Sequence, residues 1–497
     1  MEETTNLIEQ RKNKCEEFRA EGINPYVYRF KISHSIYSIV KKFKEAPHDE
    51  FEKIDDQFVI AGRLLTKRKH GKTLFGHIQD ASEKIQIYVR SNEVGNDNYL
   101  SIVKFDIGDF LGIKGRVFKT KTGELTIWAK EVTLLTKSIR PLPEKWHGLK
   151  DIEIRYRQRY VDLIVNPEVR KVFKIRALII QSIRDFLNQR DFLEVETPIM
   201  QSIPGGATAK PFKTFHNVLD MELYLRIAPE LYLKRLVVGG LERVYEINKS
   251  FRNEGISTDH NPEFTMLEFY MAYADYNDLM DLTEELFCLL SKKIHGDAPL
   301  EICDQKVDFR APWKRVSYLN AIIEIGNVEP DRLKGLENLK LLAKELKIPL
   351  QKDMENDEGK ILAKIFDIFV EPKLIQPTFV VDFPLSLSPL AKKKEDSPDL
   401  VERFELFIGG KEIANAYTEL NDPADQKQRF EKQVAKRTKE GDEEAHWMDL
   451  DYIRALEYGM PPTAGEGIGI DRLTMLLTGC KSIRDVIFFP QLKREEI

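Results

Sequence analysis

Residues suited to binding a charged small molecule occur in three separate stretches of the sequence. The first, residues 251–273, begins with Arg252 and then alternates, so that four side chains share one face of a predicted strand: Phe264, Met266, Glu268 and Tyr270. An acid and a phenol among apolar neighbours are costly to bury without partners, and an arginine grips a carboxylate or phosphate with two hydrogen bonds. A hairpin with solvated charges is the simpler interpretation, but a ligand site is favoured because the other two stretches carry matching chemistry.

The second stretch, residues 403–420, predicts a hairpin that turns at Gly409-Gly410. Glu405 and Glu412 flank that turn, and two adjacent carboxylates are natural ligands for Mg²⁺, which usually keeps water and substrate phosphates as its other ligands. Asn415, Tyr417 and Glu419 then alternate and share a face. The tyrosine suits an aliphatic chain and the glutamate a cation at its end.

The third stretch, residues 465–477, is a glycine-rich strand that runs into a helix, with Arg472 in the first helical turn. Its glycines leave room for a flat ligand against the backbone. The spacing differs from that of a dinucleotide-binding loop. A flexible loop, Pro204–Ala207, and a predicted helix that starts near Glu230 add a further acid, whose ionised form the helix N-terminus favours.

The first stretch, FRNEGISTDHNPEFTMLEFYMAY, resembles motif 2 of the class II aminoacyl-tRNA synthetases, and within them the lysyl-tRNA synthetases. GEGIGIDRLTMLL resembles motif 3, and the predicted helix 167–188 with the predicted strand 192–200 resembles motif 1, which builds the dimer interface in class II enzymes. The resemblance extends from about residue 55 to the C-terminus.

The resemblance implies roles in binding ATP. Arg252 is expected to bridge the amino-acid carboxylate and the α-phosphate, and Arg472 to hold the other phosphates; these two are the expected catalytic residues. Glu405 and Glu412 are expected to hold Mg²⁺. The remaining ATP contacts are expected from Asn253, Glu254, His260, Asn261, Phe264, Glu412, Ile413, Gly469, Ile470 and Asp471, with Phe264 stacked on adenine and Glu466 replacing an expected apolar or aromatic neighbour.

An acid-rich pocket is the feature that points to lysine among the amino acids. Glu230 with the Gly206 backbone is expected to take the α-ammonium group, while Glu268, Tyr270 and Glu419 take the ε-ammonium group. The full set expected to contact lysine is Gly206, Glu230, Arg252, Glu268, Tyr270, Asn415, Tyr417 and Glu419.

Short strands with turn signals fill residues 57–140 and predict a small β-barrel, most economically an OB-fold. The segment carries 15 Lys and Arg against 8 Asp and Glu, a local net charge of +7, which suits a nucleic-acid surface. GKTLFGHIQDASEKIQIYV resembles the anticodon-binding barrel of the same family. That resemblance implies that Phe75 stacks on an anticodon base, with Arg68, Gln86 and Glu124 around it.

The predicted architecture is α+β. A helical extension (1–55) precedes the barrel (56–141), a linker (142–166) and a catalytic domain (167–497) with a helical insertion at about 328–375. Strands expected at 192–200, 223–227, 243–270, 379–420 and 463–470 predict a mixed, mostly antiparallel sheet flanked by helices.

Composition and cysteine usage limit the class of protein. Four scattered cysteines argue against a disulfide scaffold or zinc site and indicate a cytoplasmic protein, and no apolar run approaches the length of a membrane span. The net charge of −5 gives no strong overall field. Neither a membrane nor DNA is expected as a partner; a second copy of the chain, as a homodimer, is.

The expected function is ATP-dependent activation of L-lysine and its transfer to tRNA(Lys). The alternatives are an aspartyl- or asparaginyl-tRNA synthetase of the same fold, an enzyme that lysylates a protein, and a catalytically inactive RNA-binding protein with an OB-fold. The acid-rich pocket argues against the first, the barrel against the second, and the presence of both Arg252 and Arg472 against the third.

Overall fold

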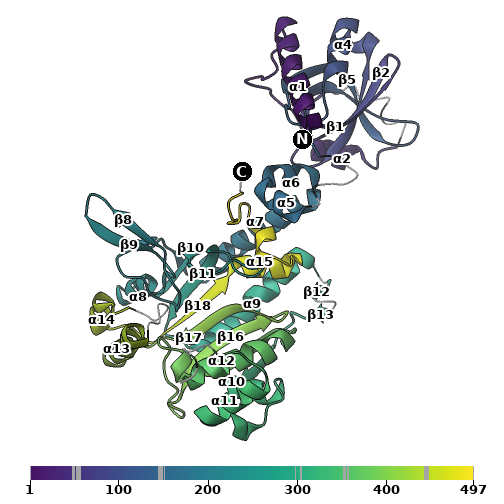
Figure 1. Ribbon diagram of the computed structural model, residues 1–497. Helices are drawn as coiled ribbons and strands as arrows, with labels where there is room; N and C mark the ends of the chain where they lie inside the picture. Colours follow the sequence, from purple (N-terminus) through teal and green to yellow (C-terminus); the bar gives the residue numbers. More distant parts are fainter. Residues whose placement is uncertain are drawn as a thin grey trace. The chain divides into compact units, whose positions relative to one another are not determined.

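The computed structural model describes residues 2–47, 51, 57–143, 149, 151–296, 298–302, 305–350, 354, 357–440 and 447–495. The chain forms two compact units, residues 1–150 and 151–497, each described here by itself (Figure 1).

The first unit is built around a closed five-stranded barrel in the order β1-β2-β3-β5-β4, in which β1 also pairs with β4. Alternate residues of its strands are buried, as in β2, because successive side chains point to opposite faces. The predicted OB-fold barrel is confirmed. The strands are β1 (Phe58–His70), β2 (Thr73–Gln79), β3 (Lys84–Arg90), β4 (Phe110–Lys119) and β5 (Leu125–Thr136).

The N-terminal helices α1 (Glu2–Ala20) and α2 (Ile36–Phe43) share the hydrophobic core of the barrel. Phe18 of α1 and Ile36 of α2 are fully buried in it, and the Phe18 ring meets Phe105 edge-on. The expected extension is therefore packed on the barrel, and residues 52–56, where its boundary was expected, lie outside the described part. Two short helices, α3 (Ser91–Val94) and α4 (Asn96–Lys104), complete the unit.

A fully buried ion pair closes one end of the barrel. Lys137 Nζ lies 2.8 Å from Asp109 Oδ1 and 2.7 Å from Asp106 Oδ2. Asp109 also accepts hydrogen bonds from the backbone amides of Asp106 and Ser138. Burial of both charges is tolerated because each finds several polar partners.

The second unit is organised around an eight-stranded sheet in the order β14-β15-β16-β17-β18-β11-β10-β6. Only β14–β15 and β10–β6 pair in parallel. The predicted mixed, mostly antiparallel sheet is confirmed. The strands are β14 (Lys314–Ser317), β15 (Thr378–Pro384), β16 (Leu400–Ile408), β17 (Lys411–Thr418), β18 (Thr463–Gly469), β11 (Glu263–Ala272), β10 (Arg243–Phe251) and β6 (Leu193–Glu194).

Two predicted strands belong elsewhere. The segment 192–200 forms β6 in the main sheet and β7 (Met200–Gln201) in a separate three-stranded sheet, because Pro198 interrupts the pairing. The strand predicted at 223–227 is β9 (Met221–Leu225), which pairs with β7 and β8 (Lys213–His216) in that smaller sheet. A hairpin of β12 (Leu300–Ile302) and β13 (Gln305–Val307) is also separate.

Helices α7 (Pro167–Asn188) and α9 (Tyr276–His295) cover one face of the large sheet (Figure 1). Ile183 and Phe287 from these helices share a buried core with Phe269 and Ile468 of the strands. Because strand residues alternate in direction, Phe264, Met266, Glu268 and Tyr270 lie on the other face. The side chains on that face do not pack against α7 and α9 and can form a polar site.

The segment expected as a linker, 142–166, contains two helices, α5 (Ile152–Arg157) and α6 (Arg159–Val165). Fully buried Arg159 bonds to Asp162 and to the carbonyl oxygens of Arg484 and Phe488, so the basic-aromatic run is anchored within the second unit. Residues 144–148 and 150 lie outside the described part.

Helices α11 (Leu336–Glu345) and α12 (Glu358–Phe369) lie in the region of the expected insertion and, with α10 (Tyr318–Glu324), share a core with β14, β15 and β16, where Tyr318 stacks on Phe366. The other helices of the unit are α8 (Glu230–Val238), α13 (Pro423–Glu440), α14 (Leu450–Glu457), α15 (Ile470–Thr478) and α16 (Ile483–Val486). Among the described residues, no helix combines the length and the apolar character needed to cross a membrane.

Replacing Lys137 with methionine is expected to destabilise the barrel by about 3–5 kcal/mol, because it leaves buried Asp109 without its cation. The measurement is hydrogen exchange of peptides from β4 and β5 in the full-length chain over a denaturant series. Lys114→Met is the control, because the Lys114–Glu131 pair is exposed to solvent and is expected to contribute about 1 kcal/mol or less. Equal losses of protection in both variants would contradict this prediction.

Candidate active site

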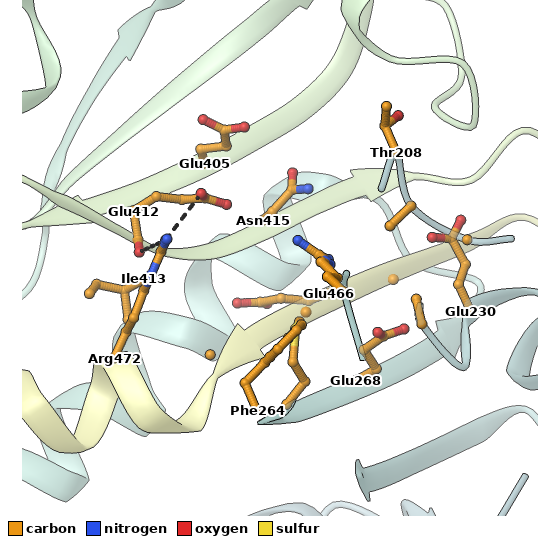
Figure 2. Close-up of a pocket in the computed structure, with 18 of the residues that line it drawn as sticks. Thr208, Glu230, Phe264, Glu268, Glu405, Glu412, Ile413, Asn415, Glu466 and Arg472 are labelled. Carbon is orange, nitrogen blue, oxygen red and sulfur yellow. Dashed lines mark hydrogen bonds and ion pairs between the residues drawn. The ribbon is translucent and has the colours of Figure 1, made fainter. Parts of the chain in front are cut away.

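A cavity of about 490 Å³ lies on the face of the large sheet opposite α7 and α9. Its walls come from β11, β16, β17 and β18, from the loop that joins β10 to β11, and from the starts of α8 and α15. Figure 2 shows Glu405, Glu412 and Arg472 toward one end and Glu230 and Thr208 toward the other, with Asn415 between. The predicted alternation of β11 is confirmed, since its four side chains line the cavity: Phe264, Met266, Glu268 and Tyr270.

Arg252 enters the cavity from the loop between β10 and β11. The hydrogen bond from its backbone amide to the Pro262 carbonyl, at 2.9 Å, closes the neck of that loop. Its guanidinium lies 5.1 Å from the centre of the Phe264 ring, and its Nε is buried without a hydrogen-bond partner in the described structure. Burial lowers the pKa of Arg252 from its usual value, and nearby carboxylates oppose that change. An unpaired, buried donor of this kind suits an anionic ligand.

A second guanidinium, that of Arg472, lies at the start of α15. It donates to the Glu412 carbonyl oxygen at 2.9 Å and approaches Glu412 Oε2 at 3.4 Å, as drawn in Figure 2. His260 Nε2 lies 3.3 Å from the same group. Burial and the charge of Arg472 lower the pKa of His260, which favours a neutral imidazole.

Glu405 and Glu412 reach the cavity from adjacent strands across the Gly409-Gly410 turn, whose φ angles of 65° and 72° suit glycine. Burial raises the pKa of Glu405 to about 8; the Arg403 guanidinium opposes the rise and the charge of Glu412 adds to it. Two mutually repelling carboxylates on a cavity wall fit a divalent cation that keeps other ligands. Among the described residues, no set of three or more His, Cys, Asp and Glu side chains is arranged to hold a metal.

The other end of the cavity is acidic. Glu230 begins α8, and its Oε1 accepts a hydrogen bond from the Tyr417 hydroxyl at 2.7 Å. Burial raises the pKa of Glu268 to about 8, and the charge of Glu230 adds to the rise. Tyr270 is buried beside both. Buried acids that outnumber the cations around them create a preference for a cationic ligand.

Glycines set the closeness of this packing. A Cβ on Gly465 would lie 2.3 Å from Tyr270 Cε1 and 2.4 Å from Glu419 Oε1, and one on Gly467 would lie 2.9 Å from Met266 Cε. The space expected for a flat ligand is therefore taken by pocket side chains at these two positions. Gly206, at φ 86°, similarly lies against Glu230, where a Cβ would come within 2.9 Å of the glutamate Cβ.

Three of the expected site residues do not line the described cavity: Asn253, Glu419 and Ile470. Glu419 Oε1 lies beside Tyr270 at the place where a Gly465 side chain would stand, and the residue is almost fully buried. Asp471 reaches the wall, but its carboxylate accepts from the Thr265 amide at 2.7 Å and pairs with Arg176 of α7 at 2.6 Å. Its visible contacts hold β11, α7 and α15 together.

Glu466 borders the cavity, but its carboxyl group points away from it. Its carboxylate accepts hydrogen bonds from Thr283 Oγ1 of α9 at 2.7 and 2.9 Å, on the covered face of the sheet. The alternation of β18 explains this, because Gly465 and Gly467 occupy the cavity side. Burial raises the pKa of Glu466 to about 8, which favours a protonated carboxyl.

Lys234 and Arg403 contact site residues, and the sequence did not reveal them. Lys234 follows Glu230 by four residues on α8, a helical spacing that places the two side chains together, and its Nζ lies 2.7 Å from Glu230 Oε1. Arg403 donates from Nε to Asn415 Oδ1 at 3.0 Å and pairs with Glu405. The i,i+4 spacing was the one available signal, because the contacts of Arg403 depend on strand pairing.

The barrel of the first unit carries the other expected site. Phe75 lies opposite Arg68 on β1 and Tyr88 on β3, and its ring centre is 4.6 Å from that of Tyr88. Gln86 donates to Glu124 Oε2 at 2.7 Å. The structure thus brings together all four residues expected to meet an anticodon.

Additional aromatic and basic residues extend this surface beyond the prediction. Trp128 lies 5.6 Å from Tyr88 and 5.7 Å from Phe118 between ring centres, and the Arg116 guanidinium lies 4.7 Å over the Trp128 ring. Rings with adjacent cations form a platform on which single-stranded bases can stack.

Both structural units match known protein families. Residues 151–493 match the family model of class II tRNA synthetases (D, K and N), and residues 58–135 match the OB-fold nucleic acid binding domain. The chain is 56% identical to a lysine–tRNA ligase of Carboxydothermus hydrogenoformans, over 99% of both chains. It is 56% identical to that of Pelotomaculum thermopropionicum, over 100% of this chain and 96% of the relative. It is 52% identical to the lysine–tRNA ligase of Halalkalibacterium halodurans, over 99% of this chain and 97% of the relative.

The cavity of the second unit lies within the residues that match the synthetase model, and the barrel of the first unit is the part that matches the OB-fold model. By its sequence and its architecture, the chain belongs to the lysine–tRNA ligase family of class II aminoacyl-tRNA synthetases.

Proposed function

We infer that the enzyme activates L-lysine with ATP and transfers the lysyl group to the 3′ end of tRNA(Lys), releasing AMP and pyrophosphate. The observation that carries this inference is the charge pattern of one cavity: Arg252 and Arg472 line it together with Glu405 and Glu412, and the buried acids Glu230 and Glu268 line it as well. Phosphates and the lysine carboxylate meet the arginines, while the two ammonium groups of lysine meet the acids.

In the first step an oxygen of the lysine carboxylate attacks the α-phosphorus of ATP, and pyrophosphate leaves with the electrons of the broken bond. Arg252 neutralises the charge on the carboxylate and the α-phosphate and aligns them, while Arg472 holds the β- and γ-phosphates. The base and ribose are proposed to contact nucleotide residues that line the cavity: Glu254, His260, Asn261, Phe264, Ile413 and Gly469. Of the other expected contacts, Asn253 and Ile470 lie outside the cavity lining, and the Asp471 carboxylate is held by Thr265 and Arg176. In the second step the terminal tRNA hydroxyl attacks the acyl carbon, and AMP leaves.

Glu405 and Glu412 would hold Mg²⁺, with Glu412 also near ATP. The ion, when bound, supplies positive charge to the phosphates. The position of Glu405 next to Glu412 on the cavity wall supports this assignment; burial raises the pKa of Glu405, and the charge of Glu412 adds to that rise.

Lysine specificity follows from the acids at the far end of the cavity. Glu230 with Gly206 takes the α-ammonium group, and Glu268, Tyr270 and Glu419 take the ε-ammonium group. Tyr417 packs the aliphatic chain, and Asn415 lies between the two ends. Aspartate would bring a second carboxylate toward buried acids, which disfavours it strongly.

The barrel surface around Phe75 is proposed to bind the anticodon of tRNA(Lys). Arg68, Gln86 and Glu124 surround that ring, and the hydrogen bond between Gln86 and Glu124 fixes their polar groups beside it. Fixed hydrogen-bonding groups next to a stacking ring are the means by which proteins read unpaired RNA bases.

A homodimer is proposed from the apolar surface of the segment that resembles motif 1. Four of its large apolar side chains are more than a third exposed: Leu178, Leu193, Ile199 and Met200. Apolar patches of this kind mark association surfaces. A cytoplasmic location is proposed because Cys15, Cys288 and Cys480 are free thiols, as a reducing compartment favours.

The direct test of the function is ATP–pyrophosphate exchange with a panel of amino acids. Lysine is expected to support exchange, and aspartate and asparagine to support little, because only lysine brings a cation to the acidic end. Exchange with aspartate would contradict the assigned specificity, and no exchange with any amino acid in the presence of Mg²⁺ would contradict the enzymatic function.

Phe75→Ala is expected to reduce aminoacylation of tRNA(Lys) by about ten- to a hundredfold, because base stacking contributes about 1–3 kcal/mol, and to leave lysine-dependent exchange unchanged. Tyr37→Ala, at an exposed tyrosine of α2, is the control and should affect neither reaction. A parallel loss of both reactions in Phe75→Ala would exclude the anticodon role.

The KM for lysine is expected to fall as pH rises from 6 to about 8 and then to level off. The pKa of Glu268 is raised to about 8, so its carboxyl is protonated below that pH and must release a proton when the cation binds. The maximal slope is about tenfold per pH unit. Glu268→Gln should remove the pH dependence of the KM for lysine and leave the pH dependence of the KM for ATP unchanged. An equal slope of the lysine KM against pH in the wild type and in Glu268→Gln would contradict the assignment.

A further inference from the structure

Lys234 is a fully buried ammonium group directly behind the lysine pocket. It projects from α8, and its Nζ lies 2.7 Å from Glu230 Oε1 and forms an ion pair with Glu419 Oε2. The same Nζ lies 5.5 Å from the centre of the Tyr417 ring. One resident cation therefore joins the two carboxylates that are proposed to receive the two different ammonium groups of the substrate.

Each of these carboxylates keeps an oxygen that Lys234 does not occupy. Glu230 lines the cavity, and both Lys234 and Tyr417 bond to its Oε1, which leaves Oε2 outside those contacts. Glu419 Oε1 is buried, has no hydrogen-bond partner in the described structure, and lies next to Gly465 on the cavity wall. Buried, unpaired oxygens of this kind indicate a ligand that supplies donors.

The charges explain why a resident cation is needed. Glu230, Glu268 and Glu419 are all buried and interact electrostatically with one another. Without a nearby cation, buried carboxylates that repel one another take up protons and become neutral. A neutral carboxyl still accepts a hydrogen bond from an ammonium group but lacks the charge that contributes most to preferring it over a methyl group. With Lys234 and Arg252 present, the five groups carry a net charge of about −1 when all are ionised, and lysine, with a net charge of +1, balances it.

The electrostatics favour a charged ammonium group at Lys234, while burial of Glu419 works against its ionised form. Burial lowers the pKa of Lys234, but the charges of Glu230 and Glu419 outweigh that effect and raise it above its usual value. Burial raises the pKa of Glu419, and the ammonium of Lys234 opposes that rise. Tyr452 of α14 faces the same group, and burial raises the pKa of its hydroxyl, so this neighbour stays neutral.

We propose that Lys234 is a positioning residue for lysine specificity: its buried ammonium keeps Glu230 and Glu419 ionised and fixes them so that their remaining oxygens receive the α- and ε-ammonium groups of the substrate. This inference rests on the proposed function. It assigns Lys234 no contact with lysine and no part in the bond-making steps.

The test compares the wild type with Lys234→Met, Glu419→Gln and the double variant. Lysine-dependent exchange gives the KM for lysine and for ATP, and L-norleucine, which has the same carbon chain without the ε-ammonium group, gives an inhibition constant. Lys334→Met, at an exposed lysine paired with Asp331, is the matched control and should match the wild type in all three constants.

Lys234→Met is expected to raise the KM for lysine by about ten- to a hundredfold, with the inhibition constant of norleucine raised much less and the KM for ATP unchanged. The ratio of the norleucine constant to the lysine KM therefore falls. In the double variant this ratio should equal that of Glu419→Gln alone, because Lys234 acts on the ε-ammonium through Glu419.

Three results would overturn the inference. An equal loss of lysine and norleucine binding in Lys234→Met would show a packing role, and tighter lysine binding would show that Lys234 competes with the substrate. A further fall of the ratio in the double variant would show an action independent of Glu419. If Lys234→Met does not fold, the double variant decides, because it removes both ions of the pair together. Absence of lysine-dependent exchange in the wild type would instead contradict the proposed function.

Discussion

Burial of charge on one face of a β-sheet is the constraint on which the rest of this active site depends. Glu230, Glu268 and Glu419 are enclosed by strands and helices, where water cannot solvate them. Such groups are stable only with fixed partners of opposite charge or with a ligand that provides them. The cations at Lys234 and Arg252, and the glycines at positions 206 and 465 that leave room for these acids, meet that requirement.

Because of the same constraint, one face of the sheet is apolar and packs against helices, and the other carries the polar site. Phe269, Ile468 and their neighbours pack against α7 and α9 and supply the apolar burial that holds the strands in place. The alternate residues are then free to be polar. Glu466 shows the cost of crossing this division, because a carboxyl on the covered face is satisfied by one threonine and its pKa is raised.

Much of this arrangement was readable from sequence, and the exceptions have physical reasons. Strand alternation was enough to place Phe264, Met266, Glu268 and Tyr270 on one face, and the helix at 167–188 had the predicted bounds. The strand predicted at 192–200 was wrong because periodicity does not show which sheet a short segment joins. The partners of Glu419 and Asn415 were unpredictable for a related reason: Lys234 and Arg403 reach them only through helix packing and strand register.

The packing around Gly465 has a consequence for how this pocket can evolve. A single methyl group at that position would collide with both Tyr270 and Glu419, so replacement of Gly465 by alanine requires these neighbours to move. A lineage that exchanged its amino-acid substrate would have to alter the wall and the acids behind it together, through intermediates that bind neither substrate well. One missing side chain thereby makes lysine specificity resistant to gradual change.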